Sequence, residues 1–278
     1  MSRNQIFTEA GDAGIPHQTR EQAQQELGFD IPVEQVPLPS LGKVYPKDHP
    51  LHMKESIQIR AMTAREEDIL TSRALIKTGE VVSALIKSCM IDKSVNPSEL
   101  LAGDRNAILT GIRVTGYGAD YNADVTCPVC NTRQKKTSNL TDLPLRMLAI
   151  DPVEQGVNAF NLTLPVSGKR ATVRFVTGAD EEEAIIINER KKKHGMQVDN
   201  LVTDRLFRSI VSIDGNNDRS KVRQFINNMP ARDSLTVRKF LDQNEPGIEQ
   251  NLAFECDMCG HEEEMPLPMG ANFFWPDS

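Results

Sequence analysis

Four of the five cysteines in this 278-residue chain form two CxxC pairs. The first pair is Cys127 and Cys130, and the second is Cys256 and Cys259. Four thiolates are the ligand set that tetrahedral zinc adopts at structural sites. Because a closed four-sulfur site leaves no coordination position for water or substrate, the pattern predicts a structural zinc ion and no catalysis at that ion.

The separation of the two pairs is unusual for a zinc ribbon. A compact ribbon has about 15–20 residues between its pairs, whereas residues 131–255 lie between Cys130 and Cys256 here. If the pairs meet, they tie the middle of the chain to its end and close a whole subdomain. Whether both pairs share one ion within one chain stays open from the sequence.

Composition limits the alternatives for these cysteines. No run approaches the ~18 apolar residues of a membrane helix, and residues 1–5 lack the apolar core of a signal peptide. The sequence therefore predicts a protein of a reducing cytoplasm, with no membrane partner, where disulfides are rare. A thioredoxin-like redox site is disfavoured, because neither pair begins a helix within a βαβ pattern.

The charge balance bears on the class of partner. The formal net charge is −7 and the isoelectric point is near 5.4, whereas nucleic-acid binding needs a clustered positive surface. The one dense basic run, 190–194, follows an acidic stretch at 180–183, which is the charge order that a helix dipole favours. We therefore expect no nucleic-acid partner.

No catalytic constellation emerges, and we predict that the protein is not an enzyme. The five histidines are scattered, and the chain has no HExxH, GxSxG or Walker-type motif. The remaining cysteine, Cys89, lies on the apolar stripe of a predicted helix. It is interpreted as a core residue rather than as a ligand or nucleophile.

The elements that must position the cysteine pairs follow from hydrophobic periodicity. Residues 51–118 predict a strand at 57–61 and three helices. Thr63 and Glu66 have capping-box spacing at the start of the first helix, which should run to about Lys77 and stop at Gly79. The expected elements between the pairs are a β-hairpin at 160–166 and 171–175 and helices near 180–193, 199–212, 218–229 and from 231.

The two ends of the chain differ from the middle. Residues 1–50 are rich in proline and predict an extended arm that runs over a surface, either disordered or ordered on a neighbouring subunit. The tail, 270–278, contains Phe273, Phe274 and Trp275. Such an aromatic cluster needs something to pack against, either this chain's own core or a partner.

Together these features predict an α+β fold. A strand and helical unit at 51–118 leads into a split zinc ribbon at 119–140 and 250–269. The ribbon encloses an inserted hairpin-and-helices subdomain at 141–249.

Several short motifs, in their order along the chain, resemble a known family. They are Leu38–Gly42 with Tyr45, Thr63–Leu70, Arg113–Tyr121, Cys127–Cys130, Met229–Ser234, Cys256–Gly260 and Phe273–Pro276. In these residues the chain resembles the baseplate hub subunit family of T-even-type contractile-tail bacteriophages and related tail-assembly proteins. The resemblance implies a non-enzymatic role at the central hub, with other tail and baseplate proteins as partners. It implies a location in the host cytoplasm during assembly or in the tail baseplate of the virion.

A second hypothesis is a zinc-ribbon adaptor that binds nucleic acid or a polymerase. It requires a basic, aromatic-bearing face on the ribbon. Lys135 and Lys136 after the first pair offer little of this, and Glu262–Glu264 after the second pair oppose it.

Overall fold

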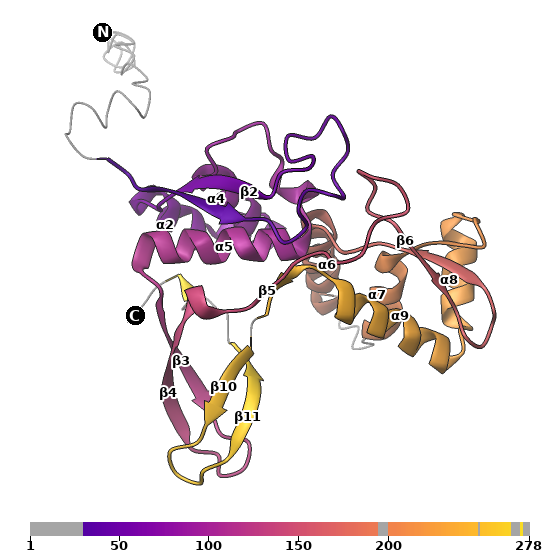
Figure 1. Cartoon of the computed structure of the whole chain (residues 1–278). Helices are drawn as coiled ribbons and strands as arrows, with labels where there is room; N and C mark the ends of the chain where they lie inside the picture. Colours follow the sequence, from indigo (N-terminus) through magenta and orange to yellow (C-terminus); the bar gives the residue numbers. More distant parts are fainter. Residues whose placement is uncertain (1–29, 194–199, 250, 268–272, 275–278) are drawn as a thin grey trace, which may run out of the picture. The chain divides into compact units, whose positions relative to one another are not determined.

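Helix α5 (Ala102–Tyr117) is the element around which much of the chain is arranged. The computed structural model describes residues 30–193, 200–249, 251–267 and 273–274. In it, α5 contacts strands from both the N-terminal part and the far end of the chain, as Figure 1 shows. The helix ends at Gly118, whose φ of +84° lies in the region that glycine tolerates best.

The segment 33–50 is part of the folded core, which corrects the prediction of a surface arm over 1–50. Strand β1 (Val33–Pro37) pairs antiparallel with β2 (Ser56–Arg60). The chain between them turns back through Leu41 and Gly42, both with positive φ, and buries Leu38 and Tyr45. The sequence did not predict this burial, because the prolines interrupt the hydrophobic periodicity of the segment without preventing its apolar side chains from being buried. The rest of the predicted arm, 1–29, lies outside the described residues.

The N-terminal helices confirm the capping box but not the length of the first helix. Thr63 and Glu66 form the box at the start of α2 (Ala64–Thr71). The chain then breaks at Ser72 and continues as α3 (Arg73–Thr78), which ends at Gly79 in the left-handed region. Helix α4 (Val81–Cys89) follows, then a 3-10 turn, η1 (Pro97–Glu99). Cys89 is fully buried, as predicted.

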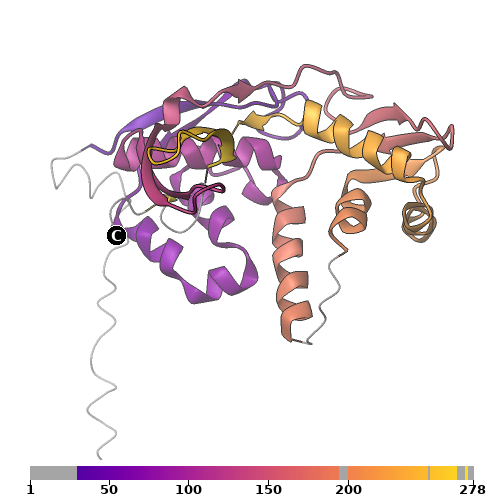
Figure 2. The same cartoon turned by 90° about the horizontal axis from the view of Figure 1, so that it is seen from below.

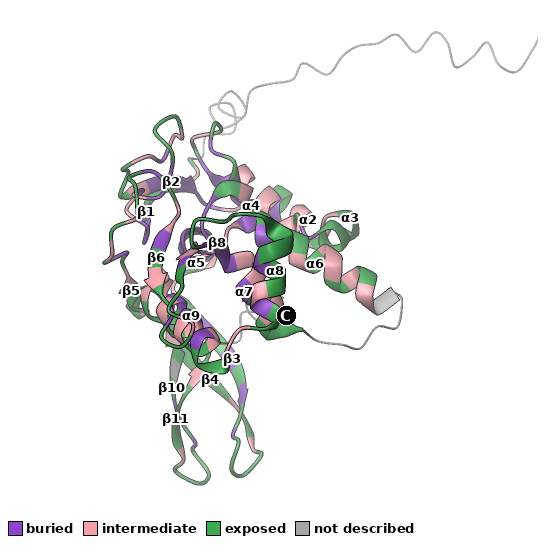
Figure 3. Ribbon diagram, turned by 90° about the vertical axis from the view of Figure 1, so that its right-hand side faces the viewer, coloured by how far each residue is buried: buried purple, intermediate pink, exposed green. Residues whose placement is uncertain are grey.

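Two β-hairpins carry the cysteine pairs. The first is β3 (Asp120–Thr126) with β4 (Arg133–Asn139), and the second is β10 (Asn251–Glu255) with β11 (Glu262–Pro266). We call them the knuckle hairpins. They lie beside one another in Figure 1, and most of their residues are exposed (Figure 3).

The ends of the predicted insertion meet. After a 3-10 turn, η2 (Leu140–Asp142), strand β5 (Leu145–Arg146) pairs antiparallel with β9 (Gly247–Ile248). This short pairing closes the segment 141–249 immediately before the second knuckle hairpin.

The predicted hairpin of the insertion is extended by a third strand. Strands β6 (Phe160–Thr163), β7 (Arg170–Val173) and β8 (Ile210–Ile213) form an antiparallel sheet. The helix expected at 199–212 is α7 (Leu201–Ser209), which ends where β8 begins. The run Ile-Val-Ser-Ile prefers a strand because β-branched side chains fit a pleated surface. The remaining helices are α6 (Gly178–Lys193), α8 (Arg219–Asn227) and α9 (Ala231–Asn244), of which α8 and α9 lie at the right-hand side of Figures 1 and 2.

The helical unit and the insertion share a single hydrophobic core. It runs from Leu38 and Ile59 through Ile108 to Phe175 and Val237. A second, smaller cluster lies under the knuckle hairpins. The combination of helices with small antiparallel sheets confirms the α+β class. Among the described residues, no helix is both long enough and apolar enough to span a lipid bilayer.

Candidate metal centre

The first CxxC pair lies in a tight turn between β3 and β4. The N–H of Cys127 donates to the carbonyl of Thr132 at 3.0 Å, and the N–H of Asn131 donates to the carbonyl of Cys127 at 2.9 Å. Asn131 has a φ of +56°, which asparagine tolerates better than most residues. The turn therefore directs Cys127 and Cys130 to the same side.

The second pair repeats this geometry in the turn between β10 and β11. The N–H of Cys256 donates to the carbonyl of His261 at 2.8 Å, and that of Gly260 donates to the carbonyl of Cys256 at 2.9 Å. Gly260, directly after Cys259, has a φ of +67°. The two turns are thus local copies of one another, each with a positive-φ residue after its second cysteine.

The structure brings all four predicted cysteines together. The Sγ atoms of Cys127 and Cys259 are 3.7 Å apart, and those of Cys130 and Cys256 are 3.6 Å apart. All four sulfurs lie within 4.8 Å of one another. Each close contact joins one hairpin to the other, so the cluster forms only when both hairpins are in place.

These distances fit tetrahedral zinc. With Zn–S bonds of about 2.3 Å, a regular tetrahedron has sulfur–sulfur edges of about 3.8 Å. The two short contacts match that edge, and the 4.8 Å limit leaves room for a modest distortion. The donor set is the one that zinc adopts at closed structural sites.

The surroundings of the sulfur atoms shift the pKa values of Cys256 and Cys259 in opposite directions. Burial opposes ionisation of Cys256, but N–H groups of the Cys259 and Met258 backbone outweigh it and lower the pKa of Cys256 to about 6. At Cys259, a backbone hydrogen bond at His261 favours the thiolate, yet burial and the neighbouring thiols raise its pKa to about 12. Closely spaced thiolates repel, so a divalent cation is needed for all four to ionise together.

Side chains around the cysteines also cross between the hairpins. Gln134 on β4 donates from Nε2 to Sγ of Cys256 at 2.9 Å and accepts the N–H of Asp257 at 3.1 Å. Lys136 forms an ion pair with Asp257 at 2.5 Å. Such outer contacts orient the ligands of a metal site. Sequence reasoning missed Gln134, since a lone glutamine on a strand carries no motif.

Beneath the cysteines lies the second hydrophobic cluster, which includes part of the aromatic tail. Phe273 is 1 % exposed and packs edge-on against Tyr121 of β3, with ring centroids 5.4 Å apart. Phe274 is half-buried against it. Phe273 is therefore used inside this chain rather than offered to a partner. Trp275, predicted with them, lies outside the described residues.

A buried arginine at the start of the motif Arg113–Tyr121, to which the sequence assigned no contact, holds this region to α5. Arg113 donates to the carbonyls of Phe273 and Gly118, both at 2.7 Å, and to that of Asp120 at 3.1 Å. It is fully buried. The knuckle hairpin and the tail are thus anchored to the helical unit by one side chain.

Comparison with known proteins identifies the family of this chain. A family model described as "T4 bacteriophage base plate protein" matches residues 34–275, which include all four clustered cysteines. No curated protein matches the chain, and no solved structure does. Since the match covers most of the sequence, the chain belongs to the family of T4 bacteriophage base plate proteins.

Proposed function

We propose that this protein is a non-enzymatic structural or assembly component of a contractile-tail phage baseplate, acting at the central hub and stapled by one zinc ion. The observation that carries the proposal is the meeting of two distant CxxC pairs within 4.8 Å in a chain of the baseplate family. A zinc ribbon split by an insertion accounts for both the spacing in sequence and the convergence in space.

A structural role for the metal follows from its ligands. Four cysteines fill the tetrahedron, so no position remains for a water molecule to be activated. Binding of zinc to such a set contributes on the order of 10 kcal/mol to the folded state, which is comparable to the net stability of a whole domain. The ion would clamp the second hairpin, and with it the end of the insertion, onto the first.

The partners proposed are other tail and baseplate proteins, met in the host cytoplasm during assembly or in the tail baseplate of the virion. The alternative, an adaptor for nucleic acid or a polymerase, has little support on the surface of the hairpins. Glu262, Glu263 and Glu264 are exposed on β11, and Lys136 is paired with Asp257. A DNA-shift assay at physiological salt tests the alternative, and we expect no shift.

The proposal is tested by deleting the gene from its phage and supplying it in trans. Deletion should abolish assembled baseplates in electron micrographs, and the wild-type chain should restore them. The Cys256→Ser variant should restore them poorly, whereas Cys89→Ala, which removes a sulfur of the main core outside the cluster, should restore them. Normal tails from the deletion would refute a role in the baseplate.

A mass-spectrometric inventory of purified virions then distinguishes a permanent component of the hub from an assembly factor. A few copies per virion would identify a permanent hub component. Absence from virions, together with failed assembly in the deletion, would identify an assembly factor. The same inventory of baseplate subassemblies tests the hub location directly, because a hub protein should accompany central rather than peripheral subunits.

A further inference from the structure

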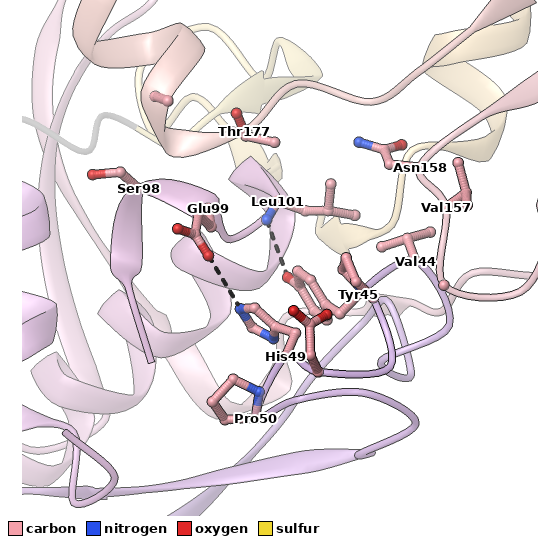
Figure 4. A pocket seen from close by; sticks show the side chains of 14 residues that line it. Val44, Tyr45, His49, Pro50, Ser98, Glu99, Leu101, Val157, Asn158 and Thr177 are labelled. Carbon is pink, nitrogen blue, oxygen red and sulfur yellow. Dashed lines mark hydrogen bonds and ion pairs between the residues drawn. The ribbon is translucent and has the colours of Figure 1, made fainter. Parts of the chain in front are cut away.

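A pocket of about 640 Å³ that none of the four clustered cysteines lines opens at the junction of three parts of the chain. Its walls come from the turn at 44–50, from residues 98–101 around η1, and from residues 156–158 with the start of α6 (Figure 4). The apolar part of the wall includes Val44, Pro50, Leu101 and Val157. Nothing in the proposed baseplate role uses it.

One wall of the pocket carries a buried histidine with an unused donor. The N–H of Leu51 donates to Nδ1 of His49 at 3.1 Å, so the proton of the neutral ring is on Nε2. The ring stacks on Tyr45 with centroids 4.6 Å apart, and its side chain is only 7 % exposed. Among the described residues, Nε2 has no hydrogen-bond partner. A buried donor left in this state costs free energy unless a ligand or water accepts from it.

Two carboxylates lie at the same pocket. Oε2 of Glu99 is 3.8 Å from Nε2 of His49, too far for a hydrogen bond, while Oε1 accepts from Asn96 at 2.9 Å. Asp48 is exposed and makes no hydrogen bond or ion pair to any residue that the structure describes. No lysine or arginine lines the pocket, so its charge is negative.

The other polar side chains of the wall are already satisfied. Asn158 exchanges two hydrogen bonds with the backbone of Phe175, at 2.9 and 3.0 Å. Thr177 donates from both its N–H and its hydroxyl to Asp180 at 2.9 Å. What remains for a ligand is one fixed N–H donor, two carboxylates and an apolar wall.

We propose that this pocket receives an arginine or lysine side chain from an extended segment of a partner protein. The methylene stem would lie along Pro50 and Val157, as long basic side chains do on apolar surfaces. The cationic head would meet Glu99 and Asp48. A main-chain carbonyl of the same segment would accept the proton on Nε2 of His49. The inference goes beyond the proposed function and is carried by the geometry of the pocket.

Other occupants fit less well. An acidic side chain would face Glu99 and Asp48 without a compensating cation. A purely apolar side chain would fill the volume but leave the buried donor of His49 unmatched. Burial lowers the pKa of His49 despite the two carboxylates, so the ring is neutral near pH 7 and supplies a donor rather than a second cation.

The test uses the full-length protein and capped single amino acids as probes. N-acetyl-arginine methylamide and N-acetyl-lysine methylamide carry the stem, the cation and a carbonyl. N-acetyl-citrulline methylamide has nearly the shape of the arginine probe but no charge. The readout is the imidazole ¹H–¹⁵N signal of His49, assigned with a His49→Gln variant. We expect saturable shifts with a Kd of about 1 mM for the basic probes, as suits ligands of this size, and at least tenfold weaker binding of citrulline.

Variants of the carboxylates sharpen the test. Glu99→Gln and Asp48→Asn alter exposed side chains and should each weaken binding of the arginine probe about threefold to tenfold, with the melting temperature unchanged. Glu262→Gln, a matched loss of charge on β11, should leave binding unchanged. Equal affinity for arginine and citrulline, preference for an N-acetyl-glutamate probe, or no saturable shift up to 50-fold above the expected Kd would each overturn the proposal, the last meaning that water alone fills the pocket.

Discussion

Nε of Arg113, on α5, lies 2.7 Å from the carbonyl oxygen of Phe273, 160 positions further along the chain. The guanidinium also binds the carbonyls of Gly118 and Asp120, where α5 ends and the first knuckle hairpin begins. Three backbone carbonyls, from two distant segments, thus depend on one buried cation. A charged donor satisfying three carbonyls is stronger than a neutral one would be, so this contact sets how firmly the tail is held.

Replacement of Arg113 by methionine should loosen the tail without removing the metal. The substitution leaves three carbonyls without their donor, and we expect a loss of about 2–4 kcal/mol in the free energy of unfolding. Urea unfolding measures the loss, and limited proteolysis should show earlier cleavage near residue 270. The control is Arg133→Met, which removes an ion pair with Asp124 in which the arginine side chain is 72 % exposed. This variant should lower the free energy of unfolding by less than about 1 kcal/mol.

Metal analysis of the purified protein should find one zinc per chain. Because the proposed ion would join two hairpins that the insertion separates, its removal by a chelator should expose 141–278 to early proteolysis. Cys256→Ser should do the same and should lower the zinc content.

Cys89→Ala separates the effect of losing a ligand from that of losing any cysteine. This variant makes a small cavity in the main core and should lower the melting temperature while keeping the full zinc content. Unchanged protease resistance in Cys256→Ser would show that the ion is not a staple.

The two glycines near the ends of α5 should respond to alanine in opposite ways. A Cβ at Gly103 would lie 1.8 Å from the carbonyl oxygen of Pro246, in the backbone that leads into β9. In Gly103→Ala the added methyl group must displace β9, and we expect the free energy of unfolding, measured by thermal unfolding, to fall by about 2–4 kcal/mol.

The control lies on the same helix. A Cβ at Gly116 would approach no atom closer than Cβ of Met62, at 3.6 Å. Gly116→Ala should be neutral or stabilise by up to about 1 kcal/mol, since alanine restricts the unfolded chain. If both variants lose equal stability, close packing of α5 against β9 is not the reason why Gly103→Ala is destabilised.

Stability should fall in acid because of Glu66. Burial opposes ionisation of this carboxyl, but hydrogen bonds from Arg60, Ser88 and Thr63 outweigh it and hold its pKa well below the ordinary value of 4.5. A carboxylate whose pKa is lowered in the folded state contributes its full stabilisation at pH values above the ordinary pKa. That contribution is lost as the pH falls towards the folded-state pKa. Unfolding measured from pH 7 to pH 2 should show this decline beginning near pH 4.5.

Glu66→Gln should flatten the acid limb of that curve and cost about 3–5 kcal/mol at pH 7, because Arg60 would stay buried beside a neutral side chain. Asp68→Asn, an exposed change on the same helix, should leave the shape of the curve unaltered. An acid limb equally steep in Glu66→Gln would assign the pH dependence to other carboxylates.

Local patterns predicted elements whose causes lie within a few residues. The capping box of Thr63 and Glu66, the stop at Gly118 and the turn of each CxxC pair depend on neighbouring side chains and on backbone conformation. Patterns failed where the cause was distant. Strand β8 exists because Ile210 and Ile213 complete a sheet with β7, and the apolar residues of 33–50 find their partners on β2 and α5.

The sequence by itself determined the candidate ligand set, four cysteines in two pairs, and the motifs spread along the region that the family model matches. Only the tertiary structure decided that the pairs meet, because convergence across residues 131–255 depends on β5 pairing with β9 and on Arg113 holding both hairpin and tail. It also decided the pocket at His49, whose walls are brought together from three separated segments. The types and spacing of residues along a chain indicate which kind of site they can form. The packing of the core decides which residues, distant in sequence, come close enough to form one site.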